Sequence, residues 1–435
     1  MGSMPSPRTS LQPIPLAAPA SHGPAAVISR RASDRLRAGY LWVYRSDVTQ
    51  LVPALGTDTP PPGALLTVLD NRGIPMGTAL YSSASQITLR MINRTPSLTR
   101  AEYLNNLRDR VQQALSMRRS LLTADASTNA CRLLFSEADD VPGILADRYA
   151  DLILIQLLTQ GAAQDDVRTL LVELLRKEFA PAAIWERPDP RIRELEQLAP
   201  PAPGPLYAAD TEKPASQTEF ALNGLRFHYD ATSGQKTGAF LDQRLNYLAA
   251  AHAACGATRT LDVCTSQGGF ALHLARVCPR VTGVDASRAA LEVADRNLGL
   301  NRPQLGANAD GVDWIEADAF ELLREFEAAG ERFDTIVLDP PAFAKTKRAA
   351  EGAMRGYKEL NLRAMKMLRP GGTLVTCSCS HHVPLAEFME AVASAASDAK
   401  RRVQVLETRG AAPDHPSVLT LPETDYLKCV ICRVG

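Results

Sequence analysis

The sequence predicts an α/β protein that ends in a parallel sheet covered by helices on both faces. From about residue 238 to residue 435, apolar strand-like runs alternate with helical segments, which is the pattern of such a sheet. Residues 26–96 instead contain short strand-like runs between glycine and proline turns, which predicts a small β-rich domain. Residues 97–216 mix both patterns, which predicts a central α+β domain.

The composition is that of a globular chain with no global charge. The 435 residues are 45% hydrophobic and 22% charged, and the formal net charge is 0. A neutral chain has no overall field that attracts nucleic acid or membrane, so any polyanion must bind a local patch. We find no apolar run of the roughly 18–20 residues that a membrane helix needs, and no secretory signal. The eight scattered cysteines fit reduced thiols. We therefore expect a cytoplasmic protein without membrane contact.

The elements before residue 238 follow from turns and periodicity. Residues 1–25 are rich in Pro, Ala and Ser, which predicts a disordered tail. Helical spacing predicts helices over 97–122 and 163–179. Residues 217–237 are expected to form a β-hairpin connection that turns at Asn223-Gly224, a type I′ pair.

The elements after residue 238 alternate regularly. Strands are expected at 259–265, 280–286, 312–318, 333–341 and 372–378, and helices at 269–277, 287–301, 319–330, 357–368 and 384–396. Ligands bind such sheets at the carboxyl ends of the strands, so the residues there are the candidate site.

A glycine turn and two acids predict a nucleotide-like ligand at that edge. "LDVCTSQGGF" (261–270) joins a strand to a helix through Gly268 and Gly269, which allow close approach of a ligand to the backbone. Asp285 ends the next strand, where an acid can hold ribose hydroxyls. Asp318 ends the third strand, where an acid can hold an adenine amino group. A dinucleotide fold shares the first two features, but its fuller G-x-G-x-x-G is absent.

The fourth strand ends in "LDPPAF" (338–343), which a dinucleotide fold does not predict. Its rigid prolines would fix Asp339 and Phe343 at the same edge of the sheet, although a Pro-Pro pair can also be a plain structural stop.

These motifs in this order resemble the class I S-adenosylmethionine-dependent methyltransferases, with a Rossmann-like fold. "GAFLDQRLNY" (238–247), "DPPAFAKTK", "RGYKELN", "TCSCSHH" and "DHP…LPETDYLKCVICRV" more narrowly resemble the PUA-domain-containing enzymes that form 5-methylcytosine in large-subunit ribosomal RNA. The resemblance runs from about residue 26 to the end. It implies a PUA-like RNA-binding domain at 26–96, a methyltransferase domain at 238–435, S-adenosylmethionine as cofactor and ribosomal RNA as partner; a homodimer stays open.

The same resemblance extends the expected cofactor site beyond the glycine turn and the two acids. It implies that Phe240, Asp242 and Gln243 line the pocket, together with residues next to the motifs already named: Asp262, Cys264, Phe270, Ala286, Ala319 and Asp339.

Cytosine carbon 5 becomes a nucleophile only when a thiolate adds to carbon 6, so this chemistry requires an activated cysteine. The Pro341-Ala342-Phe343 loop has no sulfur, which leaves Cys377 or Cys379 on the next strand. Alternation puts both on one face, so only position separates them. Cys379 is nearer the open edge and aligns with the family's nucleophile, whereas Cys377 is the better candidate for a core or lining residue. Asp339 is placed to protonate the N3 edge.

The remaining sulfur and histidine side chains have simpler interpretations. Four ligands within "CSCSHH" cannot easily surround one ion, so we expect no metal. Cys429 and Cys432 lie in an apolar closing strand and are expected in the core. His381 and His382 are expected at the rim of the site.

Two basic stretches are candidate RNA contacts. Residues 29–45 hold five arginines and one aspartate, and residues 341–369 hold eight basic and two acidic side chains. Solvated helix faces are a fair alternative for any one of them, and Phe343 could stack on a base or pack beneath its loop. The candidate contacts in these stretches are Arg35, Arg37, Phe343, Lys345, Lys347 and Arg355. The family resemblance adds Arg244, which it implies reaches RNA or the cofactor's carboxylate.

The leading hypothesis is thus S-adenosylmethionine-dependent methylation of cytosine C5 in 23S ribosomal RNA, with Cys379 as nucleophile. Two alternatives remain. One is methylation of a guanine nitrogen, for which the Asp339-Pro340-Pro341 loop would suffice without a thiolate. The other is a non-catalytic RNA-binding or ribosome-assembly protein that retains a cofactor pocket.

Overall fold

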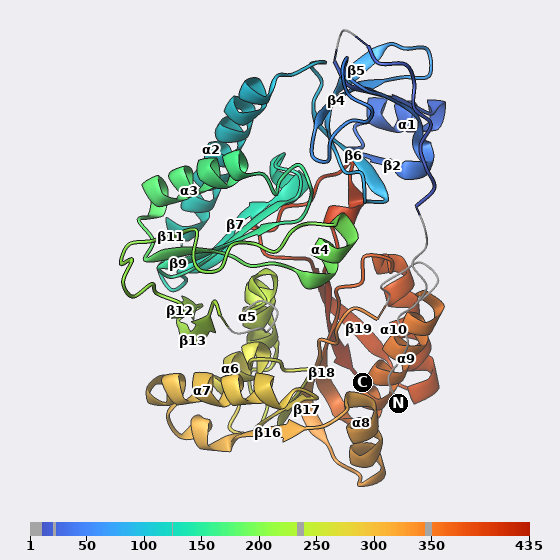
Figure 1. The fold of residues 1–435 in the computed structure, drawn as a ribbon. Helices are drawn as coiled ribbons and strands as arrows, with labels where there is room; N and C mark the ends of the chain where they lie inside the picture. The colour runs from blue at the N-terminus through green and yellow to red at the C-terminus, as the bar shows by residue number, and fades with distance from the viewer. Residues whose placement is uncertain (1–10, 21–22, 124, 233–238, 344–349) are drawn as a thin grey trace, which may run out of the picture.

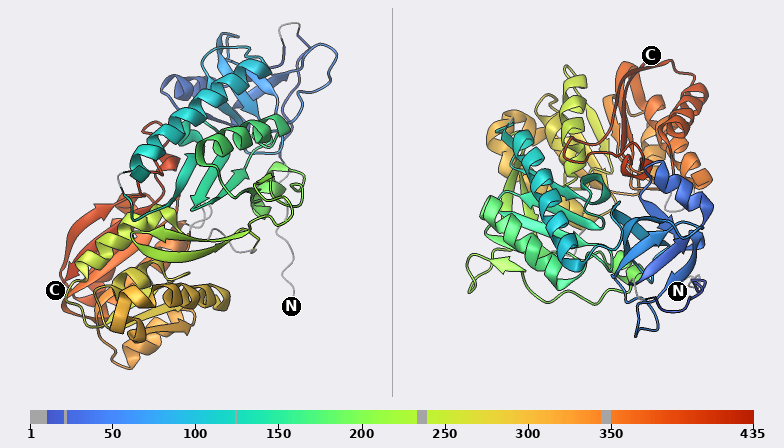
Figure 2. Two further views of the ribbon diagram at one scale, coloured as in Figure 1. Left: turned by 90° about the vertical axis from the view of Figure 1, so that its left-hand side faces the viewer. Right: turned by 90° about the horizontal axis from the view of Figure 1, so that it is seen from above.

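The computed structural model describes residues 11–20, 23–123, 125–232, 239–343 and 350–435. They form an elongated molecule in which the central domain lies beside both other domains, and the N-terminal domain also contacts a C-terminal segment (Figures 1 and 2). In the part of the chain so described, no helix is long and apolar enough to cross a membrane.

The N-terminal domain is a six-stranded sheet in the order β2-β6-β5-β4-β1-β3 around one helix, as the β-rich pattern predicted. Its elements are β1 (Ala25–Ile28), α1 (Arg30–Arg37), β2 (Trp42–Tyr44), β3 (Val48–Val52), β4 (Leu65–Leu69), β5 (Pro75–Tyr81) and β6 (Ile87–Asn93).

Part of the expected disordered tail is ordered. Residues 15–20 run beside β3, where the Ala17 amide donates to the Leu51 carbonyl at 2.8 Å and the Leu51 amide to the Pro15 carbonyl at 2.9 Å. Because β3 is an edge strand, its outward N–H and C=O groups need partners, and this segment supplies them. The prediction of disorder is therefore wrong for residues 11–20, and residues 1–10 and 21–22 lie outside the described residues.

The central domain packs two long helices on a five-stranded sheet in the order β11-β10-β9-β8-β7. Its elements are α2 (Arg100–Thr123), β7 (Ala130–Phe135), β8 (Ile144–Tyr149), β9 (Leu152–Leu157), α3 (Asp165–Phe179), β10 (Ala183–Glu186), α4 (Pro190–Glu196) and β11 (Tyr207–Ala208). The hairpin of β12 (Gln217–Leu222) and β13 (Leu225–Asp230) follows. Asn223 and Gly224 have φ of 54° and 83°, which confirms the predicted turn.

The C-terminal domain is a seven-stranded sheet in the order β16-β15-β14-β17-β18-β20-β19, with β20 antiparallel to both neighbours. Its helices are α5 (Arg244–Ala253), α6 (Gly269–Ala275), α7 (Arg288–Leu305), α8 (Ala319–Ala328), α9 (Ala350–Met367) and α10 (Leu385–Ala399). Its strands are β14 (Thr260–Val263), β15 (Val281–Asp285), β16 (Val312–Glu316), β17 (Phe333–Leu338), β18 (Leu368–Ser378), β19 (Val403–Arg409) and β20 (Lys428–Val434).

Two apolar cores lie on the two faces of this sheet, as expected for buried parallel strands. One core joins the sheet to α5, α6 and α7, and the other joins it to α8, α9 and α10 (Figure 1). Alternate strand residues enter opposite cores: Val337 faces the first, and Ile336 and Leu338 face the second. The strand order reverses between β14 and β17, so the carboxyl ends of these two strands form the crevice in which open α/β sheets bind ligands.

Candidate active site

The turn after β14 has a backbone that ordinary side chains rarely adopt. Cys264, Ser266 and Gly268 have φ of 64°, 51° and 84°. A Cβ on Gly269 would lie 2.5 Å from the buried Tyr247 ring, so that position requires glycine. The left-handed conformation costs free energy at Cys264 and Ser266 but not at Gly268, and such strain gathers where backbone must face a ligand.

Two carboxylates hold the shape of this turn. The buried Asp262 accepts the Thr265 hydroxyl at 2.6 Å and the Ala271 amide at 2.9 Å through Oδ2, and its Oδ1 has no partner among the described residues. Asp285 accepts the Ser266 amide at 2.9 Å, which ties the β15 end to the turn. Burial raises the pKa of Asp262 to about 7, against the two hydrogen bonds that lower it.

The other predicted acids and their neighbours lie along the same edge. Asp318 is exposed and caps α8 by accepting the Phe320 and Glu321 amides at 2.9 and 3.1 Å. The remaining predicted lining residues differ in burial: Phe270 is buried, Cys264 and Ala319 are partly buried, and Ala286 and Phe240 are exposed.

Asp339 lies at the crevice, where three acids gather. Gln243, in the short 3-10 helix Leu241–Gln243, donates to Asp339 Oδ1 at 3.1 Å. Asp242 from the same short helix accepts the Tyr426 hydroxyl at 2.5 Å. Burial, then the charges of Asp242 and Asp262, raises the pKa of Asp339 to about 8. A raised pKa favours the protonated form of this carboxyl near neutral pH.

The two candidate cysteines occupy different environments. Cys377 is fully buried in the core beneath α5 and α6, paired across the sheet with Cys429. Cys379 is partly exposed just beyond β18, and its Sγ lies 3.9 Å from the Pro340 carbonyl, next to Asp339. Burial, then the charges of Asp339 and Asp242, raises the pKa of the Cys379 thiol to about 12. The strand ends at Ser378, so alternation does not place Cys379 as the sequence predicted.

Tyr357 of α9 forms hydrogen bonds with the two serines that flank Cys379. The Ser378 hydroxyl donates to the Tyr357 hydroxyl at 2.8 Å, and the Tyr357 and Ser380 hydroxyls lie 2.8 Å apart. Both serines are fully buried. The sulfur thus sits between two fixed residues, which limits its movement relative to Asp339.

Comparisons with known proteins fit this geometry. A family model for S-adenosylmethionine-dependent methyltransferases matches residues 140–424, and a PUA-like domain model matches residues 27–94. The chain is 37% identical over 396 residues to ribosomal RNA large subunit methyltransferase I of Shewanella amazonensis, covering 90% of this chain and 95% of that protein. The Klebsiella pneumoniae protein of the same name is 34% identical over 414 residues, covering 94% and 98%.

The chain belongs to the S-adenosylmethionine-dependent methyltransferases. A solved structure described as such an enzyme, from Streptococcus mutans, superposes with a TM-score of 0.76 at 17% identity, covering 94% of this chain and 99% of that chain. At that identity the likeness shows the fold alone. S-adenosylmethionine is therefore the cofactor of this methyltransferase. The crevice beside the strained turn after β14 is lined by carboxylates, which suit the hydroxyl and amino groups of this cofactor.

The predicted RNA contacts of the methyltransferase differ in how exposed they are. Arg355 is exposed on α9. Phe343 packs against the Tyr357 and Phe320 rings at 4.9 and 5.9 Å, which corresponds to the packing alternative and not to a free stacking platform. Lys345 and Lys347 lie outside the described residues.

Arg244 is the clearest correction. It is only 7% exposed and forms an ion pair with the fully buried Asp414, so its guanidinium faces the junction with the central domain. The expectation that Arg244 contacts RNA or the cofactor is wrong, because a side chain enclosed by a buried carboxylate cannot reach either. Arg35 and Arg37 reach the surface but also have partners, Asp47 for Arg35 and Asp70 at 2.8 Å for Arg37.

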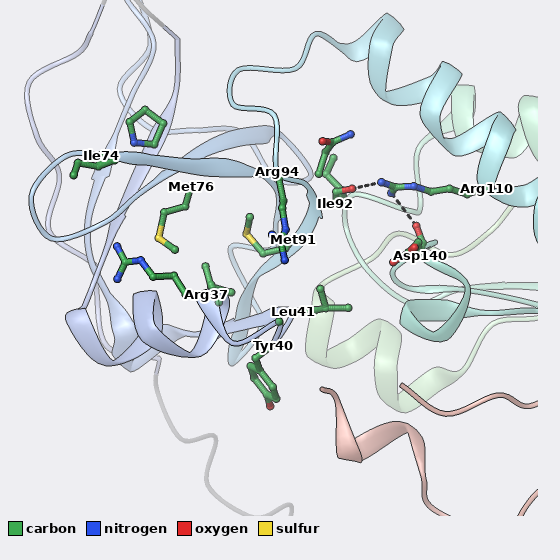
Figure 3. A pocket seen from close by; sticks show the side chains of 14 residues that line it. Arg37, Tyr40, Leu41, Ile74, Met76, Met91, Ile92, Arg94, Arg110 and Asp140 are labelled. Carbon is green, nitrogen blue, oxygen red and sulfur yellow. Dashed lines mark hydrogen bonds between the residues drawn. The ribbon is translucent and has the colours of Figure 1, made fainter. Parts of the chain in front are cut away.

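The structure also holds a buried lysine and a pocket that the sequence did not predict. Lys428 is 6% exposed beside the Cys379 segment, and its one signal was a charge at the start of a closing strand that is apolar apart from Lys428 and Arg433. A cavity of about 640 Å³ lies where the N-terminal domain meets the central domain. Figure 3 shows Leu41, Met76 and Met91 along it, with Arg37 and Arg94 also lining it and Arg110 bonded to the carbonyls of Ile92 and Asp140.

Proposed function

We propose that this methyltransferase modifies carbon 5 of a cytosine in 23S ribosomal RNA of the large subunit, with Cys379 as the nucleophile. The relatives' names give the class of substrate. The observation that carries the mechanism is the position of the Cys379 sulfur, 3.9 Å from the Pro340 carbonyl and beside Asp339, in a crevice where the Pro341-Ala342-Phe343 loop supplies no other sulfur.

The cysteine and the carboxyl divide the chemistry between them. The Cys379 thiolate forms a bond to carbon 6, and the electron pair of the C5–C6 double bond moves to C4–C5 as N3 takes the Asp339 proton. S-adenosylmethionine, when bound, would supply an electrophilic methyl group to the electron-rich carbon 5; the methyl–sulfur bond would break with its electron pair left on sulfur, which gives S-adenosylhomocysteine. Loss of the C5 proton to a base and return of the N3 proton to Asp339 then restore the C5–C6 double bond and release the thiolate.

We assign the cofactor to the crevice by the chemistry of its residues. Asp285 would hold the ribose hydroxyls and Asp318 the adenine amino group, while Gly268 and Gly269 would face the amino-acid end. Lining roles are proposed for Phe240, Asp242, Gln243, Asp262, Cys264, Phe270, Ala286, Ala319 and Asp339. Support comes from the gathering of their elements at one edge of the sheet.

We assign RNA binding to the PUA-like N-terminal domain, about residues 26–96, and to the exposed face that carries Arg355. The cavity of Figure 3 has a methionine-lined wall and arginines, which suits an unstacked base next to phosphates. No hydrogen bond or ion pair within the described residues engages the exposed Arg94. Arg94→Ala should weaken binding of a ribosomal RNA fragment and reduce the salt dependence of log K by about one. We also propose a cytoplasmic location, because the proposed substrate is ribosomal RNA. Whether the protein is a homodimer is tested by measuring its mass in solution.

The deciding experiment compares Cys379→Ala with Cys377→Ala on ribosomal RNA and on the same RNA containing 5-fluorocytosine. Fluorine at carbon 5 blocks the last elimination, so the enzyme should remain covalently attached to that RNA. We expect Cys377→Ala to retain methyl transfer and the trapped adduct, and Cys379→Ala to lose both.

Two outcomes would point elsewhere. Methyl transfer by both variants with no adduct would overturn the thiolate and favour transfer to a guanine nitrogen. Binding of S-adenosylmethionine and RNA by the wild type without any transfer would favour a non-catalytic role in ribosome assembly.

A further inference from the structure

We propose that Lys428 is a positioning residue for methyl transfer: its buried amino group, as the ammonium, anchors the Cys379 segment and favours the thiolate form of that sulfur. The inference deepens the proposed function, since it rests on Cys379 as nucleophile. It answers a difficulty of the site, because burial and the charge of Asp242 oppose a negative charge on Cys379, as does the charge of Asp339 when that carboxyl is ionised.

The geometry places Lys428 beside the nucleophile. Lys428 begins β20 and pairs across the sheet with Ser378, the last residue of β18 before Cys379. Its Nζ donates to the Ser380 carbonyl at 2.8 Å and to the Tyr426 carbonyl at 2.8 Å. The lysine therefore holds the backbone directly after the nucleophile, while Tyr357 bonds the hydroxyls of the two serines on either side of it.

The burial of Lys428 argues for a role beyond anchoring. A lysine that is 6% exposed loses most of its hydration, and an apolar or neutral polar residue would fill the space at less cost. An ammonium has three N–H donors, and two carbonyls accept from this one. Lys428 and Cys379 interact electrostatically: Lys428 lowers the pKa of the thiol, and Cys379 raises the pKa of the amine against the larger effect of burial.

The step itself is an ionisation. The proton of the Cys379 S–H bond passes to solvent, the bonding pair stays on sulfur, and the ammonium keeps its three protons. The other titratable groups that face this pair are acids, phenols and one imidazole: Asp339, Asp242, Asp425, Tyr357, Tyr426 and His381. Among these described groups, Lys428 is thus the one whose positive charge can stabilise the thiolate.

The test measures the ionisation of the thiol without methyl transfer. Iodoacetamide alkylation of Cys379, followed by peptide mass spectrometry from pH 7 to pH 10, reports the thiolate fraction. Lys428→Met should reduce alkylation at a given pH by about tenfold, the equivalent of one pKa unit, and should lower kcat with little change in the KM for S-adenosylmethionine. Lys428→Arg should restore most of both. An unchanged alkylation profile in folded Lys428→Met would overturn the inference.

A second measurement covers the case in which Lys428→Met does not fold. The alkylation measurement is then made on Lys428→Gln, whose side-chain amide can still donate two hydrogen bonds but carries no charge, and alkylation should again fall by about tenfold. Alkylation of folded Lys428→Gln equal to that of the wild type would overturn the inference. These readouts are independent of the proposed reaction: if Cys379→Ala still methylates RNA while the alkylation shift is present, the proposed function fails and the charge coupling stands.

Discussion

The Tyr40 hydroxyl of the N-terminal domain donates a 2.6 Å hydrogen bond to Oε1 of Glu423, which lies in the C-terminal domain 383 positions away. Glu423 belongs to the short 3-10 helix Pro422–Thr424, and its carbonyl lies 3.1 Å from Nδ1 of His381, two residues after Cys379. Burial, then this bond to Glu423, raises the pKa of Tyr40 well above its ordinary value. The PUA-like domain is thus in direct contact with the segment that flanks the proposed nucleophile.

We expect Tyr40→Phe to reduce kcat/KM for a structured ribosomal RNA fragment by about tenfold, because a hydrogen bond to a charged group contributes about 1.5–3 kcal/mol. The rate on a short oligonucleotide that does not reach the N-terminal domain should change less. Steady-state kinetics on both RNAs checks this. Tyr44→Phe, which removes the neighbouring hydroxyl 3.2 Å from that of Tyr40, is the matched control. Equal losses on both RNAs would contradict the role of the bridge.

The fully buried Cys377 predicts a stability effect that Cys379 does not share. Cys377→Ala removes a sulfur from a packed core and should lower the free energy of unfolding by about 1–2 kcal/mol through the cavity left behind. Cys379→Ala, at a partly exposed position, should lower it by less than about 0.5 kcal/mol. Urea denaturation of both variants measures the difference, and the reverse order would show that the two thiols had been assigned to the wrong environments.

The parallel sheet and its edge were predictable because they depend on local patterns. Strand-helix alternation and the glycine turn are set by residues close together in the chain. The preference for Cys379 over Cys377 came from its distance from the strand end and from the family resemblance, and it stays a prediction. The left-handed φ of Cys264 and Ser266 had no local signal, since neither is a residue type that marks such a turn.

The errors concern partners that are distant in sequence. Arg244 was assigned to RNA or the cofactor from the family resemblance, but its partner Asp414 is 170 positions away. Residues 11–20 were assigned to a tail from composition, yet they satisfy the edge of β3. Lys428 was given no role of its own in the closing strand, because the carbonyls that accept its hydrogen bonds come near it only in the folded chain. A single sequence does not encode such pairings in any local pattern.

The ion pair of Arg244 with Asp414 should support the junction of the central and C-terminal domains. Asp414 also accepts the Arg132 amide at 2.8 Å, and its carbonyl accepts from Arg118 at 3.0 Å. Although burial alone would raise it, the bonds and charges of His415 and Arg244 lower the pKa of Asp414. Stability from this carboxylate is therefore present above its unfolded-state pKa and is lost as the pH falls towards the lowered value.

We expect Arg244→Met to lower the free energy of unfolding by about 3 kcal/mol, because it leaves a buried carboxylate without its partner. The salt dependence of RNA binding should stay unchanged, since the guanidinium does not face solvent. Urea denaturation and salt titration check the two statements. Arg226→Met, which breaks the exposed pair with Glu219, is the control and should cost less than about 1 kcal/mol. A reduced salt slope in Arg244→Met would restore Arg244 as an RNA contact.

Asp339 should make the protein less stable as the pH rises. Burial and then the charges of Asp242 and Asp262 raise its pKa from 3.8 to about 8, so the folded state holds this proton more tightly than the unfolded chain. The free energy of unfolding should therefore decrease between about pH 4 and pH 8 as the carboxyl is forced to ionise in place.

Asp339→Asn removes that contribution. Relative to the wild type, the variant should gain at least about 1.4 kcal/mol, the equivalent of one pKa unit, between pH 5 and pH 8.5 in urea denaturation. Asp313→Asn, which removes an exposed carboxyl of β16, serves as the control. Parallel pH profiles for the wild type and Asp339→Asn would show that Asp339 is already ionised at neutral pH and cannot donate a proton to the base.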